Sequence, residues 1–133
     1  MVLKTKCMNA PPSDSDGMRV CVMQGKQVYN RQMQKFRNNY GRAMYDVKLN
    51  ILAPSKKLKK DYEDGRVSWS EYVPKFKREV LRKEKELIKV LAQWAKTSNI
   101  TFLCSEKSAE QCHRRLLVEE CKRYQPELEV IIE

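Results

Sequence analysis

The chain has 133 residues, a formal net charge of +10 and five cysteines. This length fits a single domain over 1–133 that needs no disulfide staples. No segment approaches the ~20 apolar residues that span a bilayer, and an odd number of irregularly spaced cysteines favours reduced thiols over a disulfide framework. We therefore expect a cytoplasmic protein with no membrane partner.

Two short strands are predicted near the start of the chain, over Lys4–Met8 and Met18–Met23. The loop between them, over 9–17, is rich in proline, aspartate and glycine, which break regular structure. Residues from about 25 to 42 are basic and aromatic without a clean period, so we expect an irregular or partly helical excursion. The segment 45–52 favours a strand or a short helix.

Serine caps predict the helices in the middle of the chain. Ser55 can cap a helix that stops at Gly65. Ser68–Glu71 is a capping box that opens a long helix. Apolar residues at helical spacing follow it: Val73, Phe76, Val80, Leu87, Val90, Leu91 and Trp94. Because Pro74 and the charged patch 82–86 interrupt this pattern, we expect a kink or two abutting helices.

The last third of the chain reads as strand, helix, strand. Ile100–Cys104 is a short apolar run with β-branched and aromatic members, typical of a strand. A second capping-box pattern at Ser108–Gln111 predicts a helix through Tyr124, and Leu128–Ile132 predicts a final strand. Such a crossover joins parallel neighbours. The chain therefore predicts a three-layer α/β domain, with a mostly parallel sheet of four or five strands and helices on both faces.

Positive charge is concentrated in the first half of the chain. From Arg19 to Lys60, eleven basic side chains accompany one acid, Asp46, and aromatic residues such as Tyr29 are interleaved with them. Lys and Arg neutralise phosphates, and aromatic rings stack on bases. Arg19 and Tyr29 are therefore candidate ligand-binding residues for a nucleic acid, a nucleotide or another phosphate-bearing ligand. The alternative is a solvated basic surface.

Groups capable of chemistry gather after the strand that ends at Cys104. Ligands of open α/β sheets bind outside the carboxyl ends of strands, where the next helix presents free N–H groups. We expect Cys112 and His113 in the second turn of that helix. The candidate catalytic residues are Cys104 as nucleophile or ligand, and Glu106 and His113 as acid or base. The candidate ligand-binding residues are Lys107, Ser108, Cys112, Arg114 and Arg115, with either arginine as an anion clamp.

The same residues also have structural interpretations. Cys104 and Cys112 can be small core residues, and His113 can be a hydrogen-bonded packing residue. Glu106 and either His113 or Arg114 can form a buried polar network that fixes the loop against the helix. The Cys-x7-Cys-His pattern lacks the short paired spacing of structural zinc sites, and there is no glycine-rich phosphate loop. Two cysteines, His113 and Glu106 could supply zinc ligands, but this support is weak. We therefore assign no metal and no cofactor, and whether a metal is bound stays open.

The segment Leu103–Leu117, with Cys-Ser-Glu at the strand end and Cys-His-Arg in the next helix, resembles the closing motif of the domain-of-unknown-function 488 family. The middle of the chain is similar to the YeaO-like branch of that family, in Leu52–Ser55, Tyr62, Gly65 and Trp69–Tyr72. The resemblance implies an α/β fold and an intracellular protein, and supplies no established activity. YeaO-like members tend to carry an arginine and a Trp-Pro-Arg-Gly turn after the second strand, where this chain has Gln24–Lys26.

Three functions follow from these observations and stay open. The first is binding of an anionic ligand at the strand-end site and the basic segment 19–60. The second is an enzyme that acts on a small anionic substrate through Cys104, Glu106 and His113, and the third is a purely structural motif. The sequence does not decide whether a reaction is catalysed, and it also allows a homo-oligomer.

Overall fold

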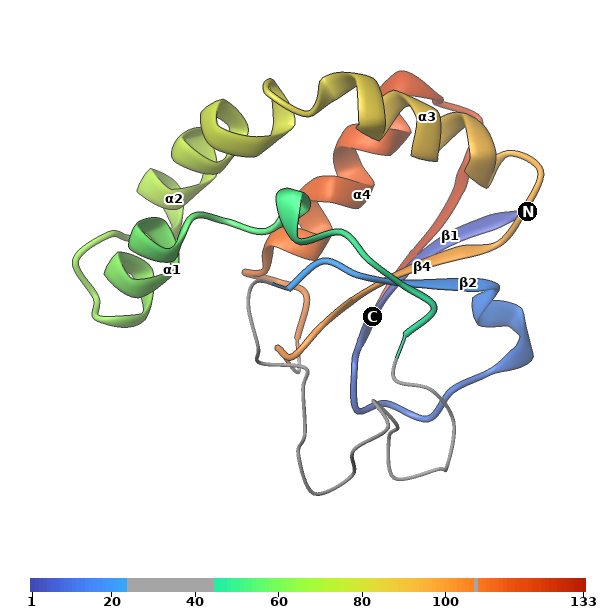
Figure 1. The fold of residues 1–133 in the computed structure, drawn as a ribbon, viewed down its shortest axis with the longest axis horizontal. Helices are drawn as coiled ribbons and strands as arrows, with labels where there is room; N and C mark the ends of the chain where they lie inside the picture. The colour runs from blue at the N-terminus through green and yellow to red at the C-terminus, as the bar shows by residue number, and fades with distance from the viewer. Residues whose placement is uncertain (24–44, 107) are drawn as a thin grey trace.

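The computed structural model describes residues 1–23, 45–106 and 108–133, and its centre is a five-stranded sheet (Figure 1). The strands are β1 Val2–Cys7, β2 Met18–Cys21, β3 Val47–Lys48, β4 Ile100–Cys104 and β5 Glu129–Ile132. They are all parallel, in the order β3-β2-β4-β1-β5. The predicted α/β class, parallel sheet and strand number are confirmed.

Strand β4 lies in the middle of the sheet and is buried along its whole length. Ile100 and Phe102 belong to the main hydrophobic core. On the other face, the Thr101 hydroxyl donates a hydrogen bond to the Asp16 carbonyl at 2.7 Å. Continuous apolar runs are typical of parallel strands that are covered on both faces, which explains why this segment shows no alternation.

The α-helices are α1 Lys56–Glu63, α2 Trp69–Phe76, α3 Lys85–Ala95 and α4 His113–Tyr124. The predicted caps are present, because Ser55 Oγ accepts from Leu58 N and Ser68 forms a reciprocal capping box with Glu71. The predicted break in the long helix is also confirmed. A π-helical turn, η4 over Lys77–Leu81, separates α2 from α3.

The apolar stripe predicted across this break is wrong at two positions. Val90 and Trp94 are 59% and 46% exposed. The inward residues of α3 are Ile88, Leu91, Ala92 and Ala95. A π-helical turn holds more residues than an α-helical turn, so the face of α3 that meets the core is rotated relative to a single continuous helix.

The described α-helices cover one face of the sheet. Helix α4 packs against β1, β4 and β5, and α3 packs on α4, as Figure 1 shows. The 3-10 helix η1, Asp14–Asp16, lies on the opposite face, where Thr101 meets Asp16. The predicted excursion of about 25–42 lies outside the described residues.

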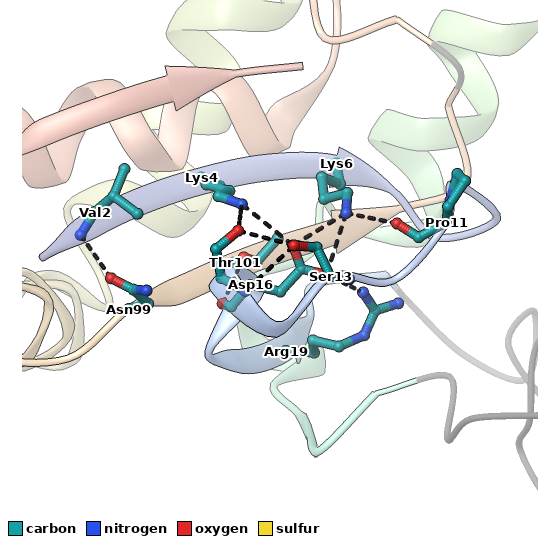
Figure 2. Close-up of polar contacts among 10 residues, drawn as sticks. Val2, Lys4, Lys6, Pro11, Ser13, Asp16, Arg19, Asn99 and Thr101 are labelled. Atoms are coloured by element: carbon teal, nitrogen blue, oxygen red, sulfur yellow. Dashed lines mark hydrogen bonds and ion pairs between the residues drawn. The ribbon is translucent and has the colours of Figure 1, made fainter.

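The Asp16 cluster holds η1 to the sheet (Figure 2). The Asp16 carboxylate is fully buried and contacts Arg19 Nη1 at 2.6 Å, Lys6 Nζ at 3.0 Å and Lys4 Nζ at 3.4 Å. Burial alone would raise the pKa of Asp16. Hydrogen bonds from the Ser13 backbone, Lys6 and Arg19, together with the charge of Lys6, lower the pKa by more than burial raises it. The pKa of Asp16 therefore lies below its usual range. Arg19 is therefore a member of a buried ion cluster.

Candidate functional site

A pocket opens where β4 ends and α4 begins, and we call it the strand-end pocket. Its volume is about 50 Å³. The lining residues come from the sheet edge, α1, α2 and the start of α4: Met23, Pro54, Lys59, Tyr62, Glu63, Tyr72, Cys104, Ser105, Glu106, Gln111, Cys112 and His113. This is the position at which parallel α/β sheets bind ligands.

Helix α4 begins later than predicted, and this places Cys112 and His113 at its very start. The Ser108–Gln111 capping box does not form, because Ser108 Oγ accepts from Glu110 N at 3.1 Å inside a local turn. Cys112 is the N-cap, with extended backbone angles and no side-chain cap bond, and His113 is the first helical residue. Local serine bonds of this kind compete with helix initiation. The delayed start brings both side chains to the pocket.

Cys104, Cys112 and His113 form a buried Cys–His centre in the strand-end pocket. Their sulfur and ring-nitrogen atoms all lie within 4.8 Å of one another. His113 Nε2 lies 2.7 Å from the Val22 carbonyl oxygen. Because a carbonyl only accepts hydrogen bonds, Nε2 carries the hydrogen, and in the neutral ring Nδ1 keeps its lone pair. Nδ1 lies 3.9 Å from Cys112 Sγ, so the lone pair is on the side of the sulfurs.

The two cysteines of the centre share a proton unequally. A hydrogen bond from Cys112 lowers the pKa of Cys104 to about 5, against the effect of burial, and His113, the Glu106 backbone and Arg114 act in the same direction. The pKa of Cys112 is raised well above its usual range, because its thiol donates to Cys104 and is buried. Such a pair titrates as a unit, with the thiolate on Cys104.

Arg114 braces the loop before α4 from a fully buried position. Its Nη1 donates to the Glu106 carbonyl at 2.7 Å and its Nη2 donates to the Glu133 main-chain oxygen at 3.0 Å. Among the described residues, Nε of Arg114 has no hydrogen-bond partner. Arg115 is half-buried and pairs with Glu119 at 3.2 Å. The guanidinium of Arg114 thus orders the loop and adds positive charge beside the sulfurs, and neither arginine lines the pocket.

Four of the predicted site residues meet at one place: Cys104, Glu106, Cys112 and His113 line the same pocket. Glu106 is exposed there, whereas Ser108 is exposed outside it. Arg19 lies elsewhere, opposite Thr101 in register and inside the Asp16 cluster. Lys107 and Tyr29 lie outside the described residues.

Sequence reasoning missed the wall of the pocket that α1 and α2 supply. Tyr62 donates to Gln111 Oε1 at 2.8 Å and links α1 to the turn before α4. Tyr72 lies between Tyr62 and Trp69, with ring centroids 5.1 Å from each. The concentration of aromatic residues over 62–72 was a signal that could have indicated this wall.

The described part of the basic segment is largely neutralised. On α1, Lys57 pairs with Asp61 at 2.8 Å, Lys59 with Glu63 at 3.4 Å and Lys60 with Asp64 at 3.4 Å. These carboxylates lie within the four residues after Lys60, the last residue of the basic stretch. The unbalanced part is 24–44, which holds five basic residues and no acid and lies outside the described residues.

The fold and the pocket define a parallel α/β domain with a Cys–His centre at the carboxyl edge of its sheet. Residues 3–125 match the family model described as the "Active DUF488-N3 subclade". The chain therefore belongs to the domain-of-unknown-function 488 (DUF488) family, as its closing motif predicted, while the YeaO-like branch stays a prediction. Comparisons with curated proteins and with solved structures found no match.

No helix among the described residues has the length and apolar character needed to cross a membrane. All five cysteines are free. The cytoplasmic location and a homo-oligomer stay predictions.

Proposed function

We propose that this protein is an enzyme that acts on a small anionic ligand in the strand-end pocket. Cys104, Glu106 and His113 are the groups that touch this ligand. The observation that carries the proposal is the meeting of sulfur, imidazole and carboxylate groups in one pocket at the carboxyl edge of a parallel sheet. Convergent polar groups in a pocket with aromatic walls are the usual pattern of a small-molecule site.

Each group has a distinct part in the proposal. The Glu106 carboxylate is exposed at the pocket and can take a proton from the ligand or return one. His113 acts through Nδ1, since Val22 occupies Nε2. The sulfurs contact the reacting atom, and Tyr62 and Tyr72 supply an apolar wall.

The charge of the ligand follows from the surroundings of the pocket. Lys59 lines the pocket beside its ion-pair partner Glu63, and the start of α4, with Cys112 as its N-cap, lies at the same pocket. A helix start favours negative charge. The positive charge of Arg114 partly offsets the negative charge of the Cys104 thiolate. The helix start and Arg114 therefore favour an anion, whereas the carboxylates of Glu63 and Glu106, which also line the pocket, act against it.

A thermal-shift screen of inorganic phosphate, nucleotides, sugar phosphates and small carboxylates tests the ligand binding that this function requires, because a ligand of the folded state raises its apparent stability. We expect at least one compound to stabilise the wild type, and less stabilisation in Glu106→Gln and Lys59→Gln. Lys57→Gln is the matched control, since Lys57 lies on the same helix with its side chain 85% exposed. A shift that the pocket variants leave intact, or no shift with any compound, would count against the proposal.

A second candidate function is nucleic-acid binding through 24–44. The observation that favours it is the composition of that segment, in which five basic residues are interleaved with Tyr29, Phe36 and Tyr40. Electrostatic binding to phosphates weakens as salt increases. We expect the affinity for single-stranded oligonucleotides to fall with salt, and to fall further in a Lys35→Gln, Arg37→Gln variant than in a Lys83→Gln, Lys85→Gln control. Affinity that does not depend on salt would exclude this function.

A further inference from the structure

We propose that Cys104, Cys112 and His113 hold a divalent metal ion that prefers sulfur and nitrogen ligands, such as Zn²⁺, with one coordination position open to the strand-end pocket. The proposal of metal binding rests on the distances and hydrogen bonds of Cys104, Cys112 and His113 alone. Only the use of the open position, as the place where the small ligand binds, rests on the proposed function. With the metal bound, the sulfurs and His113 Nδ1 would act on that ligand through the ion, and Glu106 would contact it directly.

The donor set and its spacing suit this ion. Two thiolates and one imidazole are ligands that zinc commonly takes. In a tetrahedral site with Zn–S of about 2.3 Å and Zn–N of about 2.0–2.1 Å, neighbouring ligand atoms lie roughly 3.5–3.8 Å apart. Here Cys112 Sγ and His113 Nδ1 are 3.9 Å apart, and all three ligand atoms lie within 4.8 Å. A small contraction of side chains that are already buried together completes the site.

The hydrogen bond of His113 is the one that a metal-bound histidine makes. Such residues usually donate their second ring N–H to a carbonyl or carboxylate, which fixes the ring and its tautomer. His113 Nε2 donates to the Val22 carbonyl at 2.7 Å, and Nδ1 lies on the side of the sulfurs. The imidazole is therefore oriented for coordination without further rearrangement.

A positively charged N–H donor also lies beside the sulfurs of the centre. Arg114 Nη1 lies 3.7 Å from Cys112 Sγ. N–H donors favour ionised sulfur, which is the form that binds metal. Two thiolates also cancel the charge of a divalent ion, which limits its repulsion with the Arg114 guanidinium.

The arrangement points to an open site more than to a closed structural one. Three protein ligands with a free position are typical of catalytic zinc, whereas structural zinc has four. The sequence provided only weak support for zinc, because the Cys-x7-Cys-His pattern lacks the short paired spacing of structural zinc sites. Here one ligand comes from the end of β4 and two come from the start of α4. A disulfide between the cysteines would use the sulfurs and leave the orientation of His113 unexplained.

Metal binding can be measured directly on the full chain. The protein is incubated with Zn²⁺ or Co²⁺ and separated from unbound metal, and the metal per chain and the thiolate-to-Co²⁺ charge-transfer absorption are then recorded. We expect one ion per chain. Cys104→Ser, Cys112→Ser and His113→Gln should each lower the affinity by about 10-fold or more. Cys121→Ser is the matched control, because Cys121 is a buried cysteine of α4 that lies outside the centre.

Three results would overturn the inference: no bound metal in the wild type, unchanged affinity in the three variants, or an equal loss in Cys121→Ser. If a cysteine variant fails to fold, His113→Gln still tests the metal site. This variant should bind Co²⁺ with lower affinity, and its Co²⁺ spectrum should keep the thiolate bands. If the protein binds a metal but no small compound stabilises it, the proposed function is wrong and the metal site stands. If a small compound stabilises the protein but no metal binds, the metal site is wrong and the proposed function stands.

Discussion

The imidazole Nε2 of His113 lies 2.7 Å from the carbonyl oxygen of Val22, and this bond joins the start of α4 to the residue after β2. Both residues are buried. The histidine cannot turn without leaving a buried carbonyl unpaired, so the orientation of its other nitrogen is set by the backbone of the sheet.

Replacing His113 with leucine should destabilise the fold, because the Val22 carbonyl would lose its partner. An unpaired buried acceptor costs about 1–3 kcal/mol, and urea unfolding of His113→Leu should show a loss in this range. Arg115→Gln, two residues along the same helix, should change the free energy of unfolding by less than about 0.5 kcal/mol. Equal losses in the two variants would contradict the importance of this bond.

Removing the guanidinium of Arg114 should loosen the loop that precedes α4. Arg114→Met leaves the Glu106 and Glu133 oxygens without their donor, and we expect a loss of about 2–4 kcal/mol in the free energy of unfolding. Arg114→Lys should recover part of this loss, since one ammonium cannot reproduce the two bonds of the planar fork. Faster amide exchange over 104–106 in Arg114→Met would locate the effect, and unchanged exchange there would argue against a bracing role.

Gly17 should tolerate no side chain, whereas Gly65 should tolerate one at moderate cost. Both have positive φ, +62° and +78°. A Cβ on Gly17 would collide with the Asn99 carbonyl group, while a Cβ on Gly65 meets nothing within 4 Å. Gly65→Ala should therefore show only the backbone cost of roughly 1–2 kcal/mol. Gly17→Ala should lose clearly more in the same denaturation assay, and a similar loss in both would show that the loop after η1 gives way easily.

Asp16→Asn should be strongly destabilising, because it leaves Lys4, Lys6 and Arg19 buried without their carboxylate. Removing one partner of a buried ion pair costs about 3–5 kcal/mol. Glu119→Gln breaks only the pair with Arg115 on α4 and should change stability little. A small effect of Asp16→Asn would mean that the cluster is not needed to hold η1.

The same carboxylate predicts a dependence of stability on pH. The pKa of Asp16 is lowered in the folded protein, so its contribution is present above the pKa of the unfolded chain and is lost as pH falls through the folded pKa. We expect the unfolding midpoint of the wild type to decline below about pH 4. The midpoint of Asp16→Asn should decline less steeply, and parallel curves would contradict this assignment.

Local signals in the sequence predicted the framework of the fold. The apolar run Ile100–Cys104 forms β4 with the expected bounds. Ser55 and Ser68 cap helices as their patterns indicate. These elements were predictable because adjacent residues determine them, through apolar runs and through bonds that span three positions.

The geometry of the centre was less predictable, because distant residues decide it. Serine in a capping box is a much stronger N-cap signal than cysteine. The sequence therefore could not reveal that α4 begins after Cys112. The partner of His113 lies 91 positions away, and no local pattern indicates it. The composition after Cys104 did indicate that reactive groups gather there, but not how closely they approach.

The aromatic wall gives the molecule an optical reporter of its own state. Trp69 stacks on Tyr72, with centroids 5.1 Å apart and ring planes at 17°, and Tyr72 lines the strand-end pocket. The other tryptophan, Trp94, is 46% exposed on α3. In a Trp94→Phe background, all indole emission comes from the edge of the pocket. Occupancy by a metal or a small molecule can then be followed by fluorescence quenching, without a label and without knowledge of the reaction.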